Sequence, residues 1–307
     1  MQLAILIFII VPLLTSLNLQ GVNAYWKPKA GLTWNWVLGD NPNKINFKKG
    51  EYDVIDIDLF NADGKTIQYL HDIDIKVICY FSAGTYEPFR KESSGMRMVE
   101  GLVRTKMKDW EENWLDFRVE AIKPFMIERL DLAKEKGCDG IEFDNVDAFT
   151  NVKWKDRLTA KDQLQYNRWL AQEAHARDLS AGLKNCLELV KELVDDYDFA
   201  INEQCSDYYE CQDYHTFLKK DKAVFAAFYG LVTDKKFMNK VCRQMKHLNI
   251  SAIIKDPDEE LHYDYLRFDE KIHCSEIDSD SPPSSSDIKK KNKKKTKNFQ
   301  SDRKIDL

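Results

Sequence analysis

The stretch "GCDGIEFDNVDAF" at residues 137–149 joins a short apolar segment to a dense group of acids. Its first half is typical of a buried strand, whereas Glu142, Asp144 and Asp147 crowd the strand end. Carboxylates are costly to bury unless they are paired or used in chemistry. Because side chains alternate along a strand, Glu142 and Asp144 point to the same face. This strand end is therefore the first candidate for a functional site.

Seven further segments share this strand pattern, being almost continuously apolar and rich in β-branched or aromatic residues. Such a composition predicts strands that are buried on both faces of a parallel sheet. The eight predicted strands span residues 33–38, 54–59, 76–82, 140–145, 180–185, 199–204, 223–229 and 251–255.

Helical patterns lie between most of these strands. One begins near Ile122 and ends at Gly137, one follows a capping residue at Thr159, and one covers residues 237–248. Alternating strands and helices imply parallel strands joined by right-handed crossovers, and eight strands predict a closed (β/α)8 TIM-type barrel in a single α/β domain. The alternative is an open doubly wound sheet, which needs a glycine-rich turn after its first strand; "LGDNPN" at 38–43 is not such a turn.

The two ends of the chain differ from this domain in composition. Residues 1–24 are apolar and finish in small residues, which predicts a secretory signal peptide and a secreted, extracellular protein; the alternative is an uncleaved signal anchor. Residues 275–307 are rich in Ser and Pro and then in Lys, and we expect a disordered tail. The globular domain therefore spans residues 25–274, and no stable membrane insertion is expected.

The charge of the body argues against one class of partner. The tail holds 9 of the 46 basic and 6 of the 51 acidic residues, which leaves residues 25–274 with a net charge of −8. A nucleic-acid-binding domain is usually basic, so we expect no nucleic-acid partner. An acidic body suits a cationic ligand, while the composition leaves the oligomeric state open.

The seven cysteines fit an oxidising compartment better than a metal site. They contain no C-x-x-C pair, so a zinc site is not expected. Cys205 and Cys211 bracket a turn-like stretch and are the first expected disulfide. Cys242 with Cys274 is the second expectation, while Cys79 lies in an apolar strand and reads as a small core residue. The odd number leaves at least one thiol free.

The sequence gives little sign of a cofactor. The histidines are scattered without metal-binding spacing, and neither a Gly-x-Ser-x-Gly elbow nor a Walker loop is present. We therefore expect no cofactor. One alternative is a hydrolase that holds magnesium or calcium through Asp56, Asp58 and Asp144, because oxygen ligands alone suffice for those ions.

Polar and aromatic side chains gather at the ends of the predicted strands, and a long insertion at 83–118 follows the third. Both features fall at the carboxyl-terminal face of a barrel, where active sites lie. Two acids among amides and aromatic rings are the groups that cleave glycosidic bonds. The strand-end residues are Trp34, Trp36, Asp56, Asp58, Tyr80, Glu87, Glu142, Asp144, Asn145, Asp147, Lys184, Asn185, Asn202, Glu203 and Tyr229.

Three segments resemble one known family: "YFSAGTYEPFR" at 80–90, the opening stretch at 137–149, and "FAINEQCSDYYEC" at 199–211. They are similar to glycoside hydrolase family 114, the endo-α-1,4-polygalactosaminidase-like proteins. The resemblance implies a TIM-type barrel and a secreted enzyme that cuts amino-sugar polysaccharides of α-1,4-linked galactosamine. By motif it places the catalytic acids at Asp144, as nucleophile, and Glu203, as general acid/base. With Trp34 and Tyr80, the expected substrate groove contains Asp56, Asp58, Glu87, Asn145, Asp147, Lys184, Asn202 and Tyr229.

The sequence departs from the family pattern at several positions. The family usually has proline where Phe143 stands, an aspartate at the position of Cys186 and a glutamate at that of Phe228. These changes leave Asp144 and Glu203 in place. They motivate an alternative function, a carbohydrate-binding pseudoenzyme of the same fold.

Overall fold

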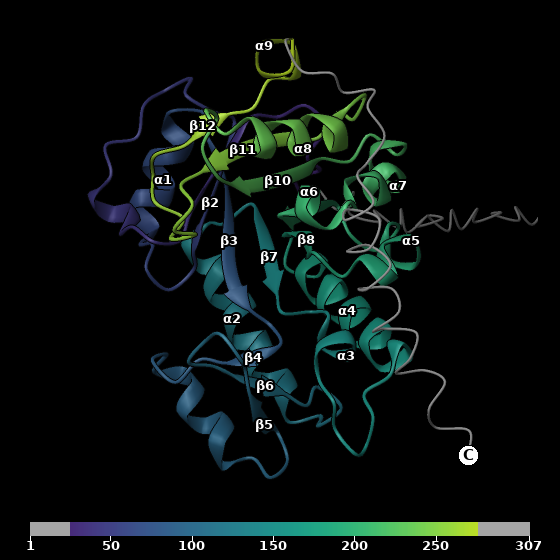
Figure 1. Cartoon of the computed structure of the whole chain (residues 1–307). Helices are drawn as coiled ribbons and strands as arrows, with labels where there is room; N and C mark the ends of the chain where they lie inside the picture. The colour runs from purple at the N-terminus through teal and green to yellow at the C-terminus, as the bar shows by residue number, and fades with distance from the viewer. Residues whose placement is uncertain (1–24, 276–307) are drawn as a thin grey trace, which may run out of the picture.

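Eight parallel strands follow one another around a barrel in chain order, as the sequence predicts (Figure 1). The structure is a computed structural model that describes residues 25–275. The observed strands differ from the predicted ones by at most one residue at either end, and the fold is the predicted TIM-type α/β barrel. They are β1 (Trp34–Val37), β2 (Val54–Asp58), β3 (Lys76–Ser82), β7 (Gly140–Asp144), β8 (Ser180–Lys184), β9 (Phe199–Glu203), β10 (Val224–Tyr229) and β11 (Ser251–Lys255).

The barrel is not closed by strand pairing. Within residues 25–275 no ladder joins β1 to β11; instead a short strand, β12 (Leu266–Arg267), pairs antiparallel with β11. The gap is bridged by Lys255, whose Nζ donates to Asn35 Oδ1 at 2.8 Å, and by Asn35 Nδ2, which donates to the carbonyl of Tyr263 at 2.9 Å. The expected closed ring is therefore completed at one seam by side chains and by the segment before β12.

Helices cover the outside of the barrel, and local signals set their ends. Thr159 and Asp162 form a capping box at the start of α4, and Gly137 ends α2 in the left-handed conformation, with a φ of 91°. The α-helices are α1 (Gly64–Asp72), α2 (Ile122–Lys136), α3 (Ala148–Asn151), α4 (Ala160–His175), α5 (Val190–Leu193), α6 (Cys205–Tyr208), α7 (His215–Leu218), α8 (Lys235–Met245) and α9 (Glu270–His273). Short 3-10 helices cover Pro42–Lys44, Glu92–Met98, Leu187–Leu189 and Cys211–Tyr214.

Two apolar layers result from the alternation of side chains along the strands. Inside the barrel, Trp34 packs against Phe225 with ring centroids 5.0 Å apart, and Phe225 packs edge-on against Phe199. The opposite faces of the strands pack against the helices in a second, larger cluster. The inner layer supports the floor of the site described below.

The insertion after β3 forms a small sheet of its own, in which β6 (Asn113–Leu115) lies between β4 (Thr85–Tyr86) and β5 (Val103–Lys106). Figure 1 shows it beyond the arrowheads of β3 and β7, at the carboxyl-terminal end of the barrel. Gly84 lets the chain turn there, because a Cβ at this position would lie 1.8 Å from the carbonyl oxygen of Asn145.

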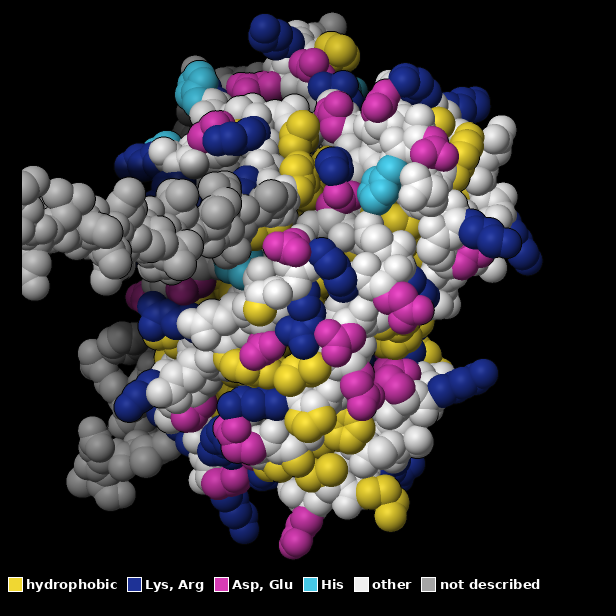
Figure 2. Space-filling model, turned by 180° about the vertical axis from the view of Figure 1, so that it is seen from behind, with side chains coloured by type: hydrophobic (Ala, Val, Ile, Leu, Met, Phe, Trp, Pro, Cys, Tyr) yellow, Lys and Arg dark blue, Asp and Glu magenta, His cyan; other side chains and the backbone are white. Residues whose placement is uncertain are grey.

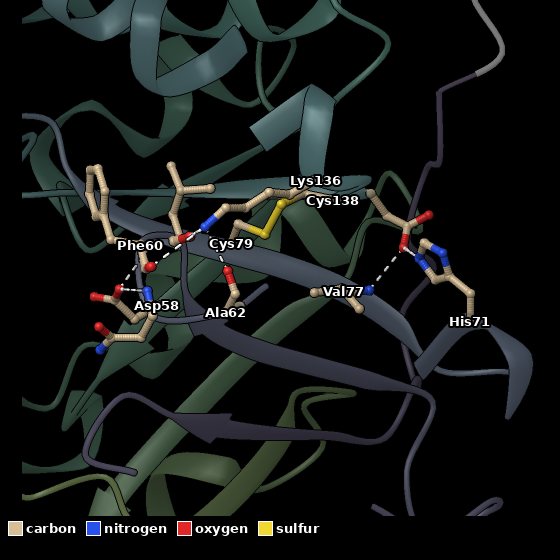
Figure 3. The surroundings of a disulfide bond; sticks show 11 residues. Asp58, Phe60, Ala62, His71, Val77, Cys79, Lys136 and Cys138 are labelled. Carbon is tan, nitrogen blue, oxygen red and sulfur yellow. Dashed lines mark hydrogen bonds and ion pairs between the residues drawn. A yellow bond between two sulfur atoms is a disulfide. The ribbon is translucent and has the colours of Figure 1, made fainter. Parts of the chain in front are cut away.

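The described residues contain three disulfides, whose partners are 59, 6 and 32 residues apart in the chain. Cys205–Cys211 and Cys242–Cys274 are the two pairs expected from the sequence. The interpretation of Cys79 as a plain core residue is wrong, because it is bonded to Cys138. This bond ties the end of α2 to β3, and Figure 3 shows Lys136 beside it, pointing toward the carbonyl of Ala62. Cys186 is the one free thiol among the described residues, and it is buried.

The surface mixes both signs of charge. Figure 2, seen from behind, shows Lys and Arg interspersed with Asp and Glu, and hydrophobic side chains gathered in the lower half. Within residues 25–275 no helix has the length and apolar character that a membrane crossing requires. The expected signal peptide at 1–24 and almost the whole of the expected tail lie outside the described residues.

Candidate active site

A pocket of about 280 Å³ lies at the carboxyl ends of the strands, between the barrel and the insertion. Its volume is near the lower end of the range for ligand sites, about 300–1,000 Å³. The strand ends supply its floor, and the insertion and later loops supply its walls. It is lined by Trp36, Leu38, Tyr80, Met107, Trp110, Glu112, Trp114, Asp144, Asn145, Asp147, Asn151, Lys184, Asn185, Glu203, Glu259 and Leu261.

Asp144, the last residue of β7, is held firmly on the pocket floor. Its Oδ2 accepts hydrogen bonds from Tyr80 Oη and Asn145 Nδ2, both at 3.1 Å, and its Oδ1 lies 3.3 Å from Lys184 Nζ. Asn145 adopts a positive φ of 60°, which directs its amide back toward Asp144. With three donors around it and a side chain only 19% exposed, the Asp144 carboxyl group is held in one orientation.

Glu203, the last residue of β9, lies higher on the pocket wall. Tyr229 Oη donates to its Oε1 at 2.6 Å, and Lys184 Nζ lies 3.3 Å from its Oε2. Its backbone N–H donates to Asn185 Oδ1 at 3.1 Å, which fixes the end of the strand. The Glu203 side chain is 32% exposed, so it is more open to solvent than Asp144.

Lys184, at the end of β8, stands between the two acids. Burial opposes its charge, but the carboxylates of Asp144, Glu203 and Glu142 together raise the pKa of Lys184 well above its ordinary value. Because Asp144 Oδ1 and Glu203 Oε2 each lie 3.3 Å from the same Nζ, these two oxygens are within twice that distance of each other. One lysine therefore brings the two carboxylates together over a single pocket.

A second acid pair is buried below the floor. Asp56 and Glu142 have no exposed surface, and Trp36 Nε1 donates to Glu142 Oε2 at 3.0 Å. Burial raises the pKa of Glu142 to about 7. Burial, together with the neighbouring Glu142 carboxylate, raises the pKa of Asp56 well above its ordinary value. Both shifts favour the protonated forms of this pair, and a carboxylic acid can donate to a neighbouring carboxylate.

Comparison with known proteins identifies the family. The model of glycoside-hydrolase family GH114 matches residues 15–274. The chain belongs to family GH114. It is therefore a glycoside hydrolase, as the sequence resemblance implied, and the pocket described above lies where TIM-type barrels carry their active sites.

Solved structures agree with this assignment. The crystal structure of Aspergillus fumigatus Ega3 in complex with galactosamine is 32% identical and covers 79% of this chain and 97% of that one, with a TM-score of 0.72. The glycoside hydrolase domain of PelA from Pseudomonas aeruginosa is 12% identical over 76% of this chain and 97% of that one, with a TM-score of 0.59, and shows the fold alone. A comparison with curated protein sequences found no significant match.

Four of the predicted groove residues line the pocket of this GH114 protein, and six lie behind its wall. Tyr80, Asn145, Asp147 and Lys184 line it, together with Asp144 and Glu203. The residues behind the wall are Trp34, Asp56, Asp58, Glu87, Asn202 and Tyr229, of which Tyr229 still contacts Glu203.

The residues behind the wall have clear physical reasons for their positions. Asp58 and Glu87 both form ion pairs with Arg90, so they serve an interior charge cluster. Trp34 belongs to the apolar core of the barrel. Asn202 alternates with Glu203 and therefore faces outward, where its amide donates to Tyr214 Oη at 3.1 Å.

The metal-dependent alternative lacks a suitable cluster. Within residues 25–275 no three His, Cys, Asp or Glu side chains are arranged to hold a metal ion. Asp58 pairs with Arg90, while Asp56 lies below the floor against Glu142, so neither is directed to a common position with Asp144.

Two of the departures from the family pattern, at Cys186 and Phe228, do not line the pocket. Phe228 alternates with Tyr229 and is buried in the outer layer beneath the helices. Cys186 is also buried there, and Asn167 Nδ2 lies 3.6 Å from its sulfur. The substitutions that motivated the pseudoenzyme alternative are therefore accommodated in the packing rather than in the GH114 site.

The insertion supplies pocket residues that sequence reasoning did not select: Met107, Trp110, Glu112 and Trp114. Their segment was expected at the correct face of the barrel, but a loop pattern does not show which of its residues turn inward. The apolar–acidic composition of "DWEENW" at 109–114 is the one signal that points to three of them, Trp110, Glu112 and Trp114.

Proposed function

We propose that this chain is a secreted glycoside hydrolase that cleaves polymers of α-1,4-linked galactosamine. The observation that carries the proposal is the shared contact of Asp144 and Glu203 with Lys184 at the floor of one open pocket. The resemblance to Ega3, which was crystallised with galactosamine, supports the sugar. The pocket also suits a cationic chain, because its lining holds five acids and one lysine.

Asp144 is assigned as the nucleophile. Its carboxylate is deep in the pocket and is aimed by Tyr80, Asn145 and Lys184, as a group that must attack along one direction requires. Attack on the anomeric carbon forms a glycosyl ester on Asp144 while the bond to the departing sugar breaks.

Glu203 is assigned as the general acid/base. It is the more exposed acid, so both the departing sugar and an incoming water reach it. In its protonated form it gives a proton to the glycosidic oxygen as the bond breaks. As a carboxylate, held in place by Tyr229 and Lys184, it then accepts a proton from the water that hydrolyses the ester.

The placement of the acids is compatible with retention of configuration. Retaining enzymes hold their carboxyl groups about 5–5.5 Å apart, and inverting ones about 6.5–9.5 Å apart. Because Asp144 and Glu203 share one lysine at 3.3 Å each, their nearest oxygens lie within twice 3.3 Å, a limit that includes the retaining separation. We therefore expect the first product to carry the α configuration, which proton NMR of a fresh digest will show.

The test of the proposed function is hydrolysis of a partly deacetylated α-1,4-galactosaminan by the purified full chain, followed as new reducing ends. Asp144→Asn and Glu203→Gln are expected to lower kcat by about 10²–10⁴-fold. Asp74→Asn, an exposed acid at the opposite end of the barrel, is the matched control. If the wild type releases no oligosaccharide and behaves like Asp144→Asn, the chain does not act as this hydrolase.

We also infer that residues 1–24 are removed during secretion and that residues 25–274 form the catalytic domain, followed by the tail. Three disulfides suit an oxidising compartment and support this inference. Amino-terminal sequencing of protein collected from the medium of a secreting host is expected to begin at Tyr25. Retention of residues 1–24 in the membrane fraction would contradict cleavage.

A further inference from the structure

Glu112 is an acid of the pocket that comes from outside the barrel. It precedes β6 in the insertion and lines the pocket, although only 9% of the residue is exposed. The mechanism proposed above gives it no task. A carboxylate this deeply buried normally has a cation or several donors around it, so its surroundings indicate what it does.

The two oxygens of Glu112 have different surroundings. Oε2 accepts a hydrogen bond of 2.5 Å from Thr85 Oγ1. Within residues 25–275 Oε1 accepts no hydrogen bond and forms no ion pair, and the Glu112 residue lines the pocket. One oxygen thus anchors the side chain, while the other remains available for a ligand.

The charged groups around Glu112 do not neutralise it. Those that face it are Glu87, Asp144 and Arg90, and the guanidinium of Arg90 is already bonded to Asp58 and Glu87. Burial is the main reason that the pKa of Glu112 rises to about 7. A cation supplied by a ligand would remove this penalty.

A chain of hydrogen bonds ties Glu112 to the nucleophile. Thr85 Oγ1, which donates to Glu112, accepts from Asn145 Nδ2 at 3.3 Å, and the same Asn145 nitrogen donates to Asp144 Oδ2 at 3.1 Å. Ser82 Oγ joins this chain through Thr85 and Asn145. The position of Glu112 relative to Asp144 is therefore fixed by side chains that pack between them.

We propose that Oε1 of Glu112 binds the ammonium group of a galactosamine unit in the pocket beside Asp144, and so selects free-amine sugars over N-acetylated ones. This inference rests on the proposed function and deepens it. An ammonium offers the charge and the donors that Oε1 lacks. An acetamide is neutral, and it would leave the buried carboxylate without a counter-charge.

The test uses the full chain with Glu112→Gln, which keeps the size of the side chain and an acceptor for Thr85. Dissociation constants are measured by calorimetry for an α-1,4-galactosamine oligomer and for its N-acetylated counterpart. A hydrogen bond to a charged group contributes about 1.5–3 kcal/mol, so affinity for the free-amine oligomer is expected to fall about 10- to 150-fold. Affinity for the N-acetylated oligomer is expected to stay unchanged or to improve.

Two further variants separate recognition from a structural role. Glu112→Asp keeps the charge but shortens its reach, so it is expected to retain part of the preference for the free amine. Glu135→Gln, an exposed residue of α2, is the matched control and is expected to behave as wild type. Melting temperatures of all variants show whether each one is folded.

Specific outcomes overturn the inference while leaving the proposed function intact. If the wild type cleaves the galactosamine polymer but Glu112→Gln keeps the full preference for the free amine, the assignment is refuted. Equal losses for both oligomers in the Gln and Asp variants would show that Glu112 only holds the insertion in place. If the wild type neither binds nor cleaves the free-amine oligomer, the proposed function itself fails.

Discussion

The ammonium of Lys184 lies 3.6 Å from Oε1 of Glu142, a carboxylate with no exposed surface directly below the pocket. The same ammonium faces Asp144 and Glu203 above it. Lys184 therefore separates an upper pair of acids, which line the pocket, from a lower pair, Asp56 and Glu142, which has no exposed surface. This arrangement lets four carboxyl groups crowd one end of a barrel.

Replacing Lys184 with Met is expected to abolish turnover and to destabilise the fold. Breaking a buried ion pair from one side costs about 3–5 kcal/mol, because the partner charges remain buried. Lys184 opposes the raised pKa of Glu142, so this pKa rises further without the lysine. Protonation of Glu142 then relieves the penalty, and the loss of unfolding free energy is expected to be smaller at pH 5 than at pH 7. Urea titrations at both pH values check this, with the half-exposed Lys220→Met as control. An equal loss at both pH values would contradict the electrostatic role.

Removing the Cys79–Cys138 disulfide is expected to destabilise the protein more than removing Cys205–Cys211. The two bonds span 59 and 6 residues, and in the chain-entropy model they restrict the unfolded chain by about 4 and about 2 kcal/mol. Urea unfolding of the two double Cys→Ala variants under oxidising conditions measures the difference. The chain-entropy model predicts that the Cys79–Cys138 variant loses more unfolding free energy than the Cys205–Cys211 variant. The reverse order would contradict this prediction.

Trp110 is expected to act as a platform for sugar units at the mouth of the pocket. It lines the pocket with 63% of its surface exposed, which is unusual for an indole without a ligand. An amino sugar offers it both an apolar ring face and a positive charge. Trp110→Ala is expected to raise KM for the polymer about 2- to 5-fold with little change in kcat, since contacts of about 0.5–1 kcal/mol are lost.

Phe89→Ala is the matched control for this prediction. Phe89 is 64% exposed on the same insertion, but it does not line the pocket. Equal effects of the two substitutions on KM would show that the exposed aromatics only support the loop. The rates are measured at several chain lengths, because a platform at the pocket mouth matters most for long substrates.

Glu112 is expected to make stability depend on pH in the absence of substrate. Its pKa in the folded protein is about 7, against an ordinary value of 4.5. Between these values the folded state binds more protons than the unfolded state, so this contribution to the unfolding free energy is full below pH 4.5 and is lost as the pH rises to 7. The loss is on the order of 2–3 kcal/mol. Glu112→Gln removes this slope, and urea titrations from pH 4.5 to 7 show it; parallel curves for wild type and variant would refute it.

The sequence predicted the barrel well because its strands carry a strong local signal. Segments such as residues 76–82 and 251–255 are continuously apolar, and the strands found there have the predicted bounds. The seam between β1 and β11 could not be predicted in the same way. It depends on Lys255 reaching Asn35 across the gap between β11 and β1, a contact between residues that are far apart in the chain.

The site was predictable where strand ends defined it, and not where loops did. Lys184 and Tyr80 lie at strand ends, and alternation alone directs both toward the pocket. Asp58 obeys the same alternation, yet Arg90 from the insertion pairs with it. Sequence periodicity cannot show that such a partner arrives from a loop, and for the same reason Glu112 was missed.

The insertion leaves and rejoins the barrel at almost one place, since the backbone N–H of Leu115 donates to the carbonyl of Gly84 at 2.9 Å. The proposed catalytic acids belong to β7 and β9, whereas this excursion carries one wall of the pocket. Because its two ends lie side by side, the segment between Gly84 and Leu115 is a natural unit to exchange for the insertion of another family member. Chimeras made by such grafting offer a route to new polymer preferences on an unchanged catalytic frame.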